Sequence, residues 1–268
     1  MVVALFTNAR DEKNIKEWAA HHLLIGFDII FIFDHKSKES LSDIFNNFDK
    51  RVIIINASYI DKNVKLTLMN MAVPIAKQYN CDWMIYLDAD EFLILNKVFI
   101  GVKHFLSKYN YAHSIGINWL MFGSNNLVSE PSGLILENYT KSELYLNKHV
   151  KSFVRPNEIL KAENPHYYNI RQPSRMYGIN KKLNYEEKSF NTFTIPFYKS
   201  LAYIAHYVNQ SEETYIKRKQ LLPRDDIGEF RDKIDTKLIH NLYNDGTNLQ
   251  PKMKYSKHVK SFLEQYNN

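Results

Sequence analysis

Residues 83–92 read WMIYLDADEF, an apolar run that leads directly into three carboxylates around one alanine. The run is rich in strand-forming residues, which predicts a strand that ends at Leu87 and delivers Asp88 and Asp90 at its carboxyl edge. Open α/β sheets bind their ligands at that edge. Two carboxylates held so close repel each other, and a divalent cation would keep both ionised. Oxygen ligands suit Mg²⁺ or Mn²⁺, which in turn would hold a diphosphate.

The Asp-x-Asp triplet also has an ordinary explanation. Such triplets are commonly solvated turns or helix caps, and Asp90 would then cap a helix that begins near Glu91. This triplet closes a buried strand and does not sit in a polar loop, which favours the interpretation as a metal and diphosphate site.

The rest of the chain alternates between strand and helix patterns before it becomes irregular. Strands are predicted at residues 2–6, 27–33, 51–55 and 83–87, and helices at 11–25, 40–48 and 63–79. This alternation is typical of parallel βαβ units with right-handed crossovers. Downstream we expect a helix at 98–109, strands at 114–122 and 201–207, helices at 211–222 and 256–266, and no clear periodicity over 131–196. The predicted fold class is α/β, with a Rossmann-like, mostly parallel central sheet, flanking helices and an irregular C-terminal half.

Length and composition limit the kind of protein. A chain of 268 residues without repeats or linkers fits one domain, which we expect at 1–222, with 223–268 as a helical extension packed on it. The net charge of +6 fits an anionic ligand such as a nucleotide and is too small for a nucleic-acid binder. The single Cys81 excludes internal disulfides and multi-cysteine zinc sites. No signal peptide or membrane span is visible, so we expect a soluble, cytoplasmic protein; its oligomeric state is not indicated.

Seven short stretches occur in the order of a known family. They lie at residues 9–12, 17–27, 31–34, 83–93, 117–124, 151–156 and 206–211. With these stretches the chain resembles the GT-A fold glycosyltransferases around glycosyltransferase family 92 and its family 2-like relatives. The resemblance ends near Leu222. It implies transfer of a sugar from a nucleotide-diphosphate sugar, with UDP as the first expectation, to a hydroxyl of a glycan or glycoconjugate, with Mn²⁺ or Mg²⁺ on the diphosphate.

The resemblance also implies roles for individual residues. Asp88 and Asp90 would be the acidic metal motif, and His206 would be a third metal ligand. His206 follows an apolar strand that would deliver it to a sheet edge, and a neutral imidazole is a good ligand for Mn²⁺. The alternative for His206 is a buried histidine bonded to backbone.

Three further positions are expected at the nucleotide. By resemblance, Asp34 would lie against the nucleoside, and Arg10 and Glu12 at the same pocket. Asp34 is equally well explained as a turn carboxylate that bonds its own backbone, and Arg10 and Glu12 as a solvated pair near a helix start. The family has a lysine where this chain has Gln210, so a phosphate contact at that position is in doubt.

Several basic and aromatic residues remain as candidates. Lys151 and Arg155 are expected to contact the diphosphate or an anionic acceptor, or else to be solvated cations. The basic run at 217–219 with Arg224 is typical of a solvated face, and the alternative is that one of its residues closes over the diphosphate. Trp119 would shape an acceptor site or belong to the core.

An inverting transfer, which the resemblance favours, needs a base for the acceptor hydroxyl, usually a carboxylate. We take Glu91, beside the metal motif, as the candidate; Glu137, Glu158 and Glu163 are the unassigned alternatives. Two rival functions remain. A nucleotidyltransferase commonly has a glycine-rich loop after its first strand, which residues 7–10 lack. An inert glycan-binding or scaffolding protein would have no need for Asp88 and Asp90.

Overall fold

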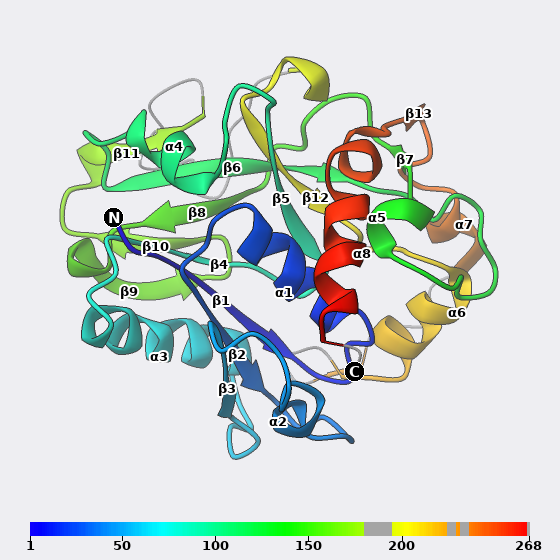
Figure 1. The fold of residues 1–268 in the computed structure, drawn as a ribbon, viewed down its shortest axis with the longest axis horizontal. Coiled ribbons are helices and arrows are strands. Elements are labelled where there is room, and N and C mark those ends of the chain that lie inside the picture. The colour runs from blue at the N-terminus through cyan, green and yellow to red at the C-terminus, as the bar shows by residue number, and fades with distance from the viewer. Residues whose placement is uncertain (180–194, 224–228, 231–235, 267–268) are drawn as a thin grey trace.

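The computed structural model describes residues 1–179, 195–223, 229–230 and 236–266. Within these ranges a nine-stranded sheet runs through the molecule (Figure 1). In spatial order its strands are β3 (Val52–Asn56), β2 (Ile29–Asp34), β1 (Val3–Ala9), β4 (Trp83–Tyr86), β8 (Val150–Val154), β6 (Ser114–Met121), β12 (Ala202–His206) and β5 (Glu91–Leu95), with β11 (Met176–Gly178) paired to β6. All pairs are parallel except β4 with β8, β6 with β8, and β5 with β12. The predicted α/β class with a mostly parallel sheet is confirmed.

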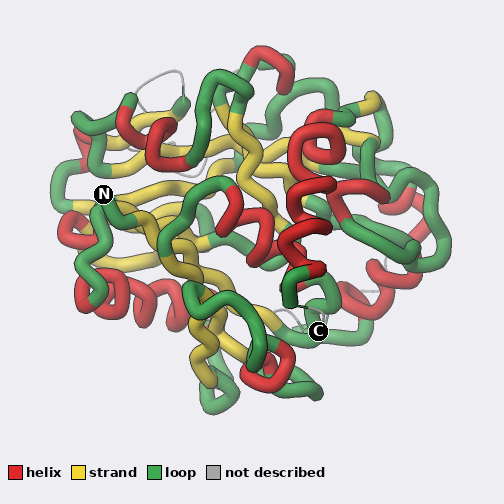
Figure 2. The backbone as a smooth tube through the Cα atoms, in the orientation of Figure 1, coloured by secondary structure: helices red, strands yellow, loops and turns green. Residues whose placement is uncertain are grey.

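Helices and short elements surround the strands (Figure 2). The helices are α1 (Ile15–Leu24), α2 (Leu41–Ile44), α3 (Val64–Gln78), α4 (Val102–Ser107), α5 (Ile135–Asn138), α6 (Glu212–Tyr215), α7 (Thr236–His240) and α8 (Lys257–Glu264). The remaining strands are β9 (Ile159–Asn164) with β10 (Tyr167–Ile170), and β7 (Lys141–Ser142) with β13 (Gly246–Thr247). No helix in the described ranges has the length and apolar character needed to cross a bilayer.

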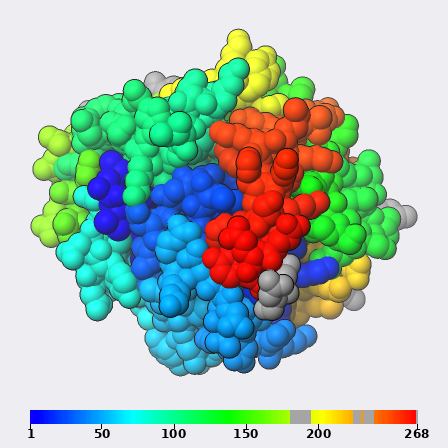
Figure 3. Space-filling view, viewed as in Figure 1, coloured from blue at the N-terminus to red at the C-terminus, as the bar shows by residue number. Residues whose placement is uncertain are grey.

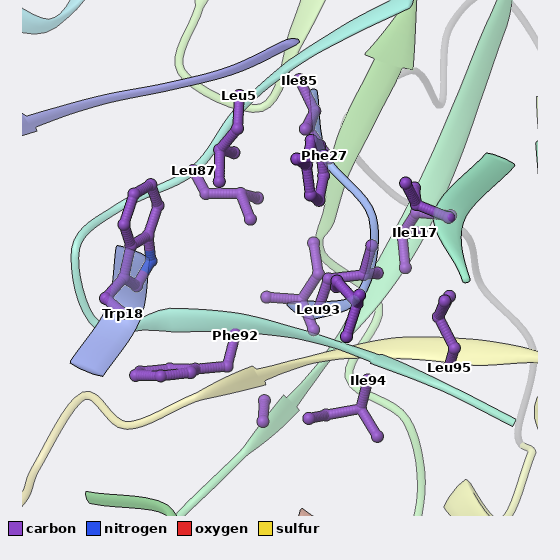
Figure 4. Close-up of a cluster of buried hydrophobic side chains, with 14 of the residues drawn as sticks. Leu5, Trp18, Phe27, Ile85, Leu87, Phe92, Leu93, Ile94, Leu95 and Ile117 are labelled. Atoms are coloured by element: carbon purple, nitrogen blue, oxygen red, sulfur yellow. The ribbon is translucent and has the colours of Figure 1, made fainter. Parts of the chain in front are cut away.

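The central strands are buried on both faces because their side chains alternate between two hydrophobic clusters. Val3 and Leu5 of β1 face the cluster that α1 covers, while Ala4 and Phe6 face the cluster that α3 covers. Figure 4 shows Leu5 and Leu87 of the first cluster close to Trp18 of α1, and Ile85 of the same cluster beside Phe27. This double burial explains why the sequence of these strands is almost continuously apolar.

Helix α1 fixes strand β5, which follows the turn at residues 88–91. The indole Nε1 of Trp18 donates a 2.8 Å hydrogen bond to the carbonyl of Glu91, and Nε2 of His21 lies 2.9 Å from the carbonyl of Leu93. Both side chains are fully buried, so these bonds are shielded from water. Helix α1 therefore places the start of β5 relative to β1 and β4.

The described part of the C-terminal segment lies over the N-terminal half (Figure 3). Tyr255 accepts a 3.2 Å hydrogen bond from the amide of Leu95 in β5. At the end of α8, the ring of Tyr266 packs on Phe48 with centroids 4.8 Å apart. Tyr255 also packs on His21 of α1, with ring centroids 4.7 Å apart, so this segment covers part of α1.

Several expected helices differ from the structure, among them the one that Asp90 would cap in the alternative interpretation. No helix begins near Glu91: a tight turn at residues 88–91, closed by the 3.0 Å bond from the amide of Glu91 to the carbonyl of Asp88, leads into strand β5. The helix expected at 98–109 is only Val102–Ser107. The helix expected at 211–222 begins at the cap Ser211 as α6 and continues as a π-helical turn, Ile216–Gln220. Arg224 lies outside the described residues.

A buried carboxyl group links α1 to α5 and gives a pH-dependent stability. Glu17 accepts the amides of Ile135 at 2.7 Å and of Leu136 at 3.0 Å, and burial raises its pKa from 4.5 to about 7. The folded state thus holds the proton of Glu17 more tightly than the unfolded state does. Protonated Glu17 therefore stabilises the fold fully below pH 4.5, and this stabilisation is lost as the pH rises through 7.

We expect Glu17→Gln, the neutral isostere, to remove this dependence. Between pH 4.5 and 8, the wild-type free energy of unfolding should fall relative to the variant by up to about 3 kcal/mol. Urea unfolding of both proteins at several pH values measures the difference. Glu39→Gln, at an exposed carboxylate, is the matched control. Parallel pH profiles for wild type and Glu17→Gln would contradict the expectation.

Candidate active site

A cleft of about 390 Å³ opens where the parallel strands β1, β4, β6 and β12 end. Asn8 comes from the end of β1, the acidic turn follows β4, and His206 is the last residue of β12. Helix α3 and the π-helical turn after α6 close two of its sides with Lys65 and Arg218. The carboxyl edge of the sheet is thus the place where charged side chains gather, as the sequence predicts.

The turn at residues 88–91 presents the carboxylates. The amide of Leu87 still bonds to the carbonyl of Phe6 in β1, and the amide of Tyr207 bonds to the carbonyl of Asp90. The Glu91 carboxylate reaches back to accept the amide of Asp88 at 2.8 Å. Three elements therefore fix a turn whose two aspartates point into the cleft.

Two lysines hold the carboxylate of Asp88. Lys65 pairs with its Oδ1, and Lys151 lies 3.1 Å from its Oδ2. Both ammonium groups are nearly buried, and Lys65 also donates to Asn8 at 3.1 Å. Burial on its own would raise the pKa of Asp88, but Lys151 and Lys65 outweigh it and hold that pKa well below 3.8. Asp88 is therefore an anion that two cations fix in place.

An arginine bridges Asp90 to the first loop. The Nη2 of Arg218 lies 3.0 Å from Oδ2 of Asp90 and 3.0 Å from Oε1 of Glu12. Burial opposes ionisation of Asp90, but Arg218 and His206 dominate and lower its pKa to about 2. Burial is also the largest effect on Glu12, and it raises that pKa in spite of Arg218. Of the basic run 217–219, Arg218 thus enters the site.

His206, the last residue of β12, lies in the same cleft as Asp88 and Asp90. The pairing of β12 with β5 sets it opposite Glu91, and its Nε2 lies 3.6 Å from Oδ1 of Asp90. Its ring packs against Trp119 with centroids 4.5 Å apart. Burial lowers the pKa of His206 to about 4, although Asp90 and Asp88 oppose this. A neutral imidazole beside a carboxylate oxygen is a suitable donor pair for a divalent cation.

Within the described ranges, no three side chains of the ligand type are arranged as a ready-made metal site. Both carboxylate oxygens of Asp88 lie against lysines, Oδ1 against Lys65 and Oδ2 against Lys151. Asp90 Oδ1 and His206 Nε2 are the ligand atoms left facing each other. The donor chemistry fits Mg²⁺ or Mn²⁺, with the remaining ligands supplied by an anionic substrate and water.

Glu91 lies behind the turn and not in the cleft. Its side chain is fully buried, one oxygen accepts the amide of Asp88, and the other has no hydrogen-bond partner among the described residues. Burial raises its pKa well above 4.5 despite Lys151, 3.7 Å away. The group shapes the turn from a position that an acceptor does not reach.

Other predicted residues divide between the cleft and its surroundings. Arg10 and Lys151 line the cleft, and the Nε of Arg10 has no partner among the described residues. Asp34 ends β2 beside β1 but accepts the amides of Ser37 at 3.3 Å and Leu41 at 3.0 Å, as a turn carboxylate does.

Two more candidates lie outside the cleft. Gln210 is buried and donates to the carbonyl of Tyr207. Arg155 donates to the carbonyls of Ala112 and Asn110 and covers the ring of Trp83, at the amino end of β4. The expected diphosphate contact from Arg155 is therefore wrong for this geometry.

Sequence reasoning missed Lys65 and His166. A signal for Lys65 exists: it stands in the first turn of a helix, where a cation opposes the helix dipole unless an anion is nearby. His166 lies in the turn between β9 and β10, inside the stretch without periodicity, and no local signal marks it.

The sequence is similar to a known family of proteins. The family model described as glycosyltransferase family 92 matches residues 3–242. A glycosyltransferase family 92 protein of Ricinus communis is 22% identical over 207 residues. That match covers 73% of this chain and 37% of the relative, so the chain spans little more than a third of the length of this curated relative.

Solved structures of low similarity include S. aureus TarS and HddC from Yersinia pseudotuberculosis. TarS has a TM-score of 0.43 at 15% identity, covering 78% of this chain and 37% of TarS. HddC has a TM-score of 0.37 at 9% identity, covering 66% of this chain and 90% of HddC.

Proposed function

This chain belongs to glycosyltransferase family 92, and from that membership we propose a specific reaction for its cleft. The enzyme moves a sugar from a nucleotide-diphosphate sugar, a UDP-sugar first, to a hydroxyl of a glycan or glycoconjugate, with inversion at the anomeric carbon. A divalent cation, Mn²⁺ or Mg²⁺, assists the departure of the nucleoside diphosphate.

One observation carries this proposal: a set of cations surrounds the turn at residues 88–91, at the edge of the sheet. Lys65, Lys151 and Arg218 come from three different elements and meet at Asp88 and Asp90. Arg10, whose Nε lacks a partner among the described residues, lies in the same cleft. Positive groups held in place before the reaction stabilise the charge that develops on a leaving diphosphate.

Asp90 and His206 would hold the cation, whose chemistry is to neutralise charge on the leaving group. The support is the pair of facing atoms, Oδ1 of Asp90 and Nε2 of His206, together with the neutral state of the imidazole. Asp88 would contribute where a lysine yields to the incoming donor. Arg10 and Glu12 would contact the nucleotide, and Asp34 would act at the nucleoside end by way of the loop it orders.

The rival functions have less support. A nucleotidyltransferase is disfavoured because the loop after β1, residues 9–14, has no glycine, and the family match is to glycosyltransferases. An inert scaffold would not need the buried Lys65 and Lys151 to pair with the partly exposed carboxylate of Asp88, because burying charged groups has a desolvation cost.

Donor binding gives the direct test. Thermal unfolding should be measured with UDP, GDP, CDP and their sugars, with and without Mn²⁺. A ligand that binds only the folded state at ~100 times Kd adds ~2.7 kcal/mol of stability. We expect one nucleotide to raise the midpoint with Mn²⁺, and Asp88→Asn to abolish the rise. If no nucleotide shifts the folded protein, the donor site does not exist.

A further inference from the structure

An inverting transfer needs a base, and the cleft has no free carboxylate to serve as one. Among the described residues that line it, the carboxylates are Glu12, Asp88 and Asp90. Arg218 holds Glu12 and Asp90, and two lysines hold Asp88. Glu91 is buried behind the turn. The neighbouring cations lower the pKa of Asp88 and Asp90 and make them poor proton acceptors. Glu12 is engaged by two hydrogen bonds from Arg218 to its Oε1. The other possible proton acceptors among the described lining residues are imidazoles.

His166 is a cleft residue with a fixed tautomer. Its Nδ1 lies 3.0 Å from the carbonyl oxygen of Val150, and because a carbonyl only accepts, Nδ1 carries the hydrogen. The lone pair is then on Nε2, which has no hydrogen-bond partner in the part of the chain that the structure describes. A backbone carbonyl that fixes the imidazole in this way is the usual means of directing a histidine at a substrate.

The turn that carries His166 is tied to the site at several points. Asn164 accepts the amide of His166 at 2.9 Å, and Lys151 donates to the carbonyl of Pro165 at 3.2 Å. The imidazole also packs on Trp119, with centroids 5.0 Å apart. Trp119 also contacts His206, so one indole ring separates His166 from a residue proposed to hold the divalent cation. This fixed position is what proton transfer demands.

The surroundings of His166 keep its imidazole neutral before the donor binds. Burial, followed by the charge of Lys151, lowers its pKa to about 4, so the imidazole is neutral at pH 7. The other ionisable groups that act on it are His149 and Asp88. A bound diphosphate would offset the charge of Lys151 and make the imidazole more basic at the moment when a base is required.

We propose that Nε2 of His166 is the general base of the transfer. This assignment rests on the proposed function. The acceptor oxygen bonds to the anomeric carbon of the donor while its proton passes to Nε2. The bond from the anomeric carbon to the diphosphate breaks, and its electron pair leaves with the nucleoside diphosphate. The imidazolium then returns the proton to water.

The test compares His166→Ala and His166→Gln with His149→Gln. His149 is the matched control, because it stacks on the same Trp119 and its Nδ1 bonds to Asn147, but it does not line the cleft. Donor binding is followed by thermal shift with UDP-, GDP- and CDP-sugars and Mn²⁺. Turnover is followed as release of the nucleoside diphosphate, with water as the acceptor.

We expect both His166 variants to keep the donor-induced shift and to lose turnover by about 10²-fold or more, while His149→Gln keeps both. Added imidazole should restore part of the rate in His166→Ala, whose side chain leaves room, and none in His166→Gln. Turnover retained in His166→Ala, lost turnover that imidazole does not restore, or a lost donor shift would each overturn the assignment. Failure of the wild-type protein to bind any donor would instead refute the proposed function.

Discussion

Asp90→Asn is expected to slow release of the nucleoside diphosphate by roughly 10²–10³-fold, the usual effect of removing one fixed charge from a transition-state site. Asparagine keeps the shape of the side chain and the backbone bond from Tyr207 to the carbonyl of residue 90. It removes the anion that faces His206 and Arg218, so the cation loses a ligand and the arginine loses a partner. The rate is measured with the donor identified by thermal shift, over a range of Mn²⁺ concentrations.

A matched control lies at the other end of the same strand. Asp82 precedes β4 and is exposed, where it accepts the amide of Val2. Asp82→Asn should therefore leave turnover unchanged. Wild-type turnover in Asp90→Asn would show that this carboxylate has no part in the reaction.

Lys151→Met is expected to destabilise the protein by about 3 kcal/mol, the lower end of the cost of breaking a buried ion pair. The side chain is 2% exposed, and its Nζ lies 3.1 Å from Asp88, 3.7 Å from Glu91 and 3.2 Å from the carbonyl of Pro165. Methionine fills similar space but leaves these three oxygens facing an apolar side chain. Urea unfolding at pH 7 measures the loss.

The control for this variant is Lys161→Met in β9, where the lysine pairs with Glu163 at the surface. Exposed pairs contribute little, so this change should alter the free energy of unfolding by no more than about 0.5 kcal/mol. Equal effects of the two substitutions would mean that the lysine pair at Asp88 has no structural importance.

The βαβ half of the fold is predictable because each strand is long, apolar and bounded by polar turns. Val3–Ala9, Ile29–Asp34 and Val52–Asn56 lie within a few residues of the predicted segments. Strand β5 was not predicted, because the short apolar run at residues 92–95 has no period that separates strand from helix. Its conformation depends on pairing with β12, more than a hundred residues later. Long-range pairing of this kind leaves no local trace.

The candidate site was predicted in part for the same reason. The edge of the sheet brings Arg10, Glu12, Asp88, Lys151 and His206 into one cleft, as the order of the strands implies. The ligand roles of these residues stay predictions. Lys65 and His166 reach the cleft from a helix and a hairpin turn, and the sequence does not say toward which edge those elements turn their side chains. The burial of Glu91 follows from the direction of β5, which the sequence also left open.

The charges that line the cleft make its two expected ligands interdependent. Five described lining residues are cationic, namely Arg10, Lys65, Lys151, Arg218 and Lys219, and three are anionic, which leaves a local excess of two positive charges. A free divalent ion meets repulsion there, whereas a nucleotide sugar, with two negative charges on its diphosphate, balances the excess. If both ligands bind as proposed, the cation would bind more tightly once the donor is present, and by thermodynamic reciprocity the donor would gain the same factor from the cation. We therefore expect Mn²⁺ alone to change the midpoint of thermal unfolding less than Mn²⁺ added together with the donor.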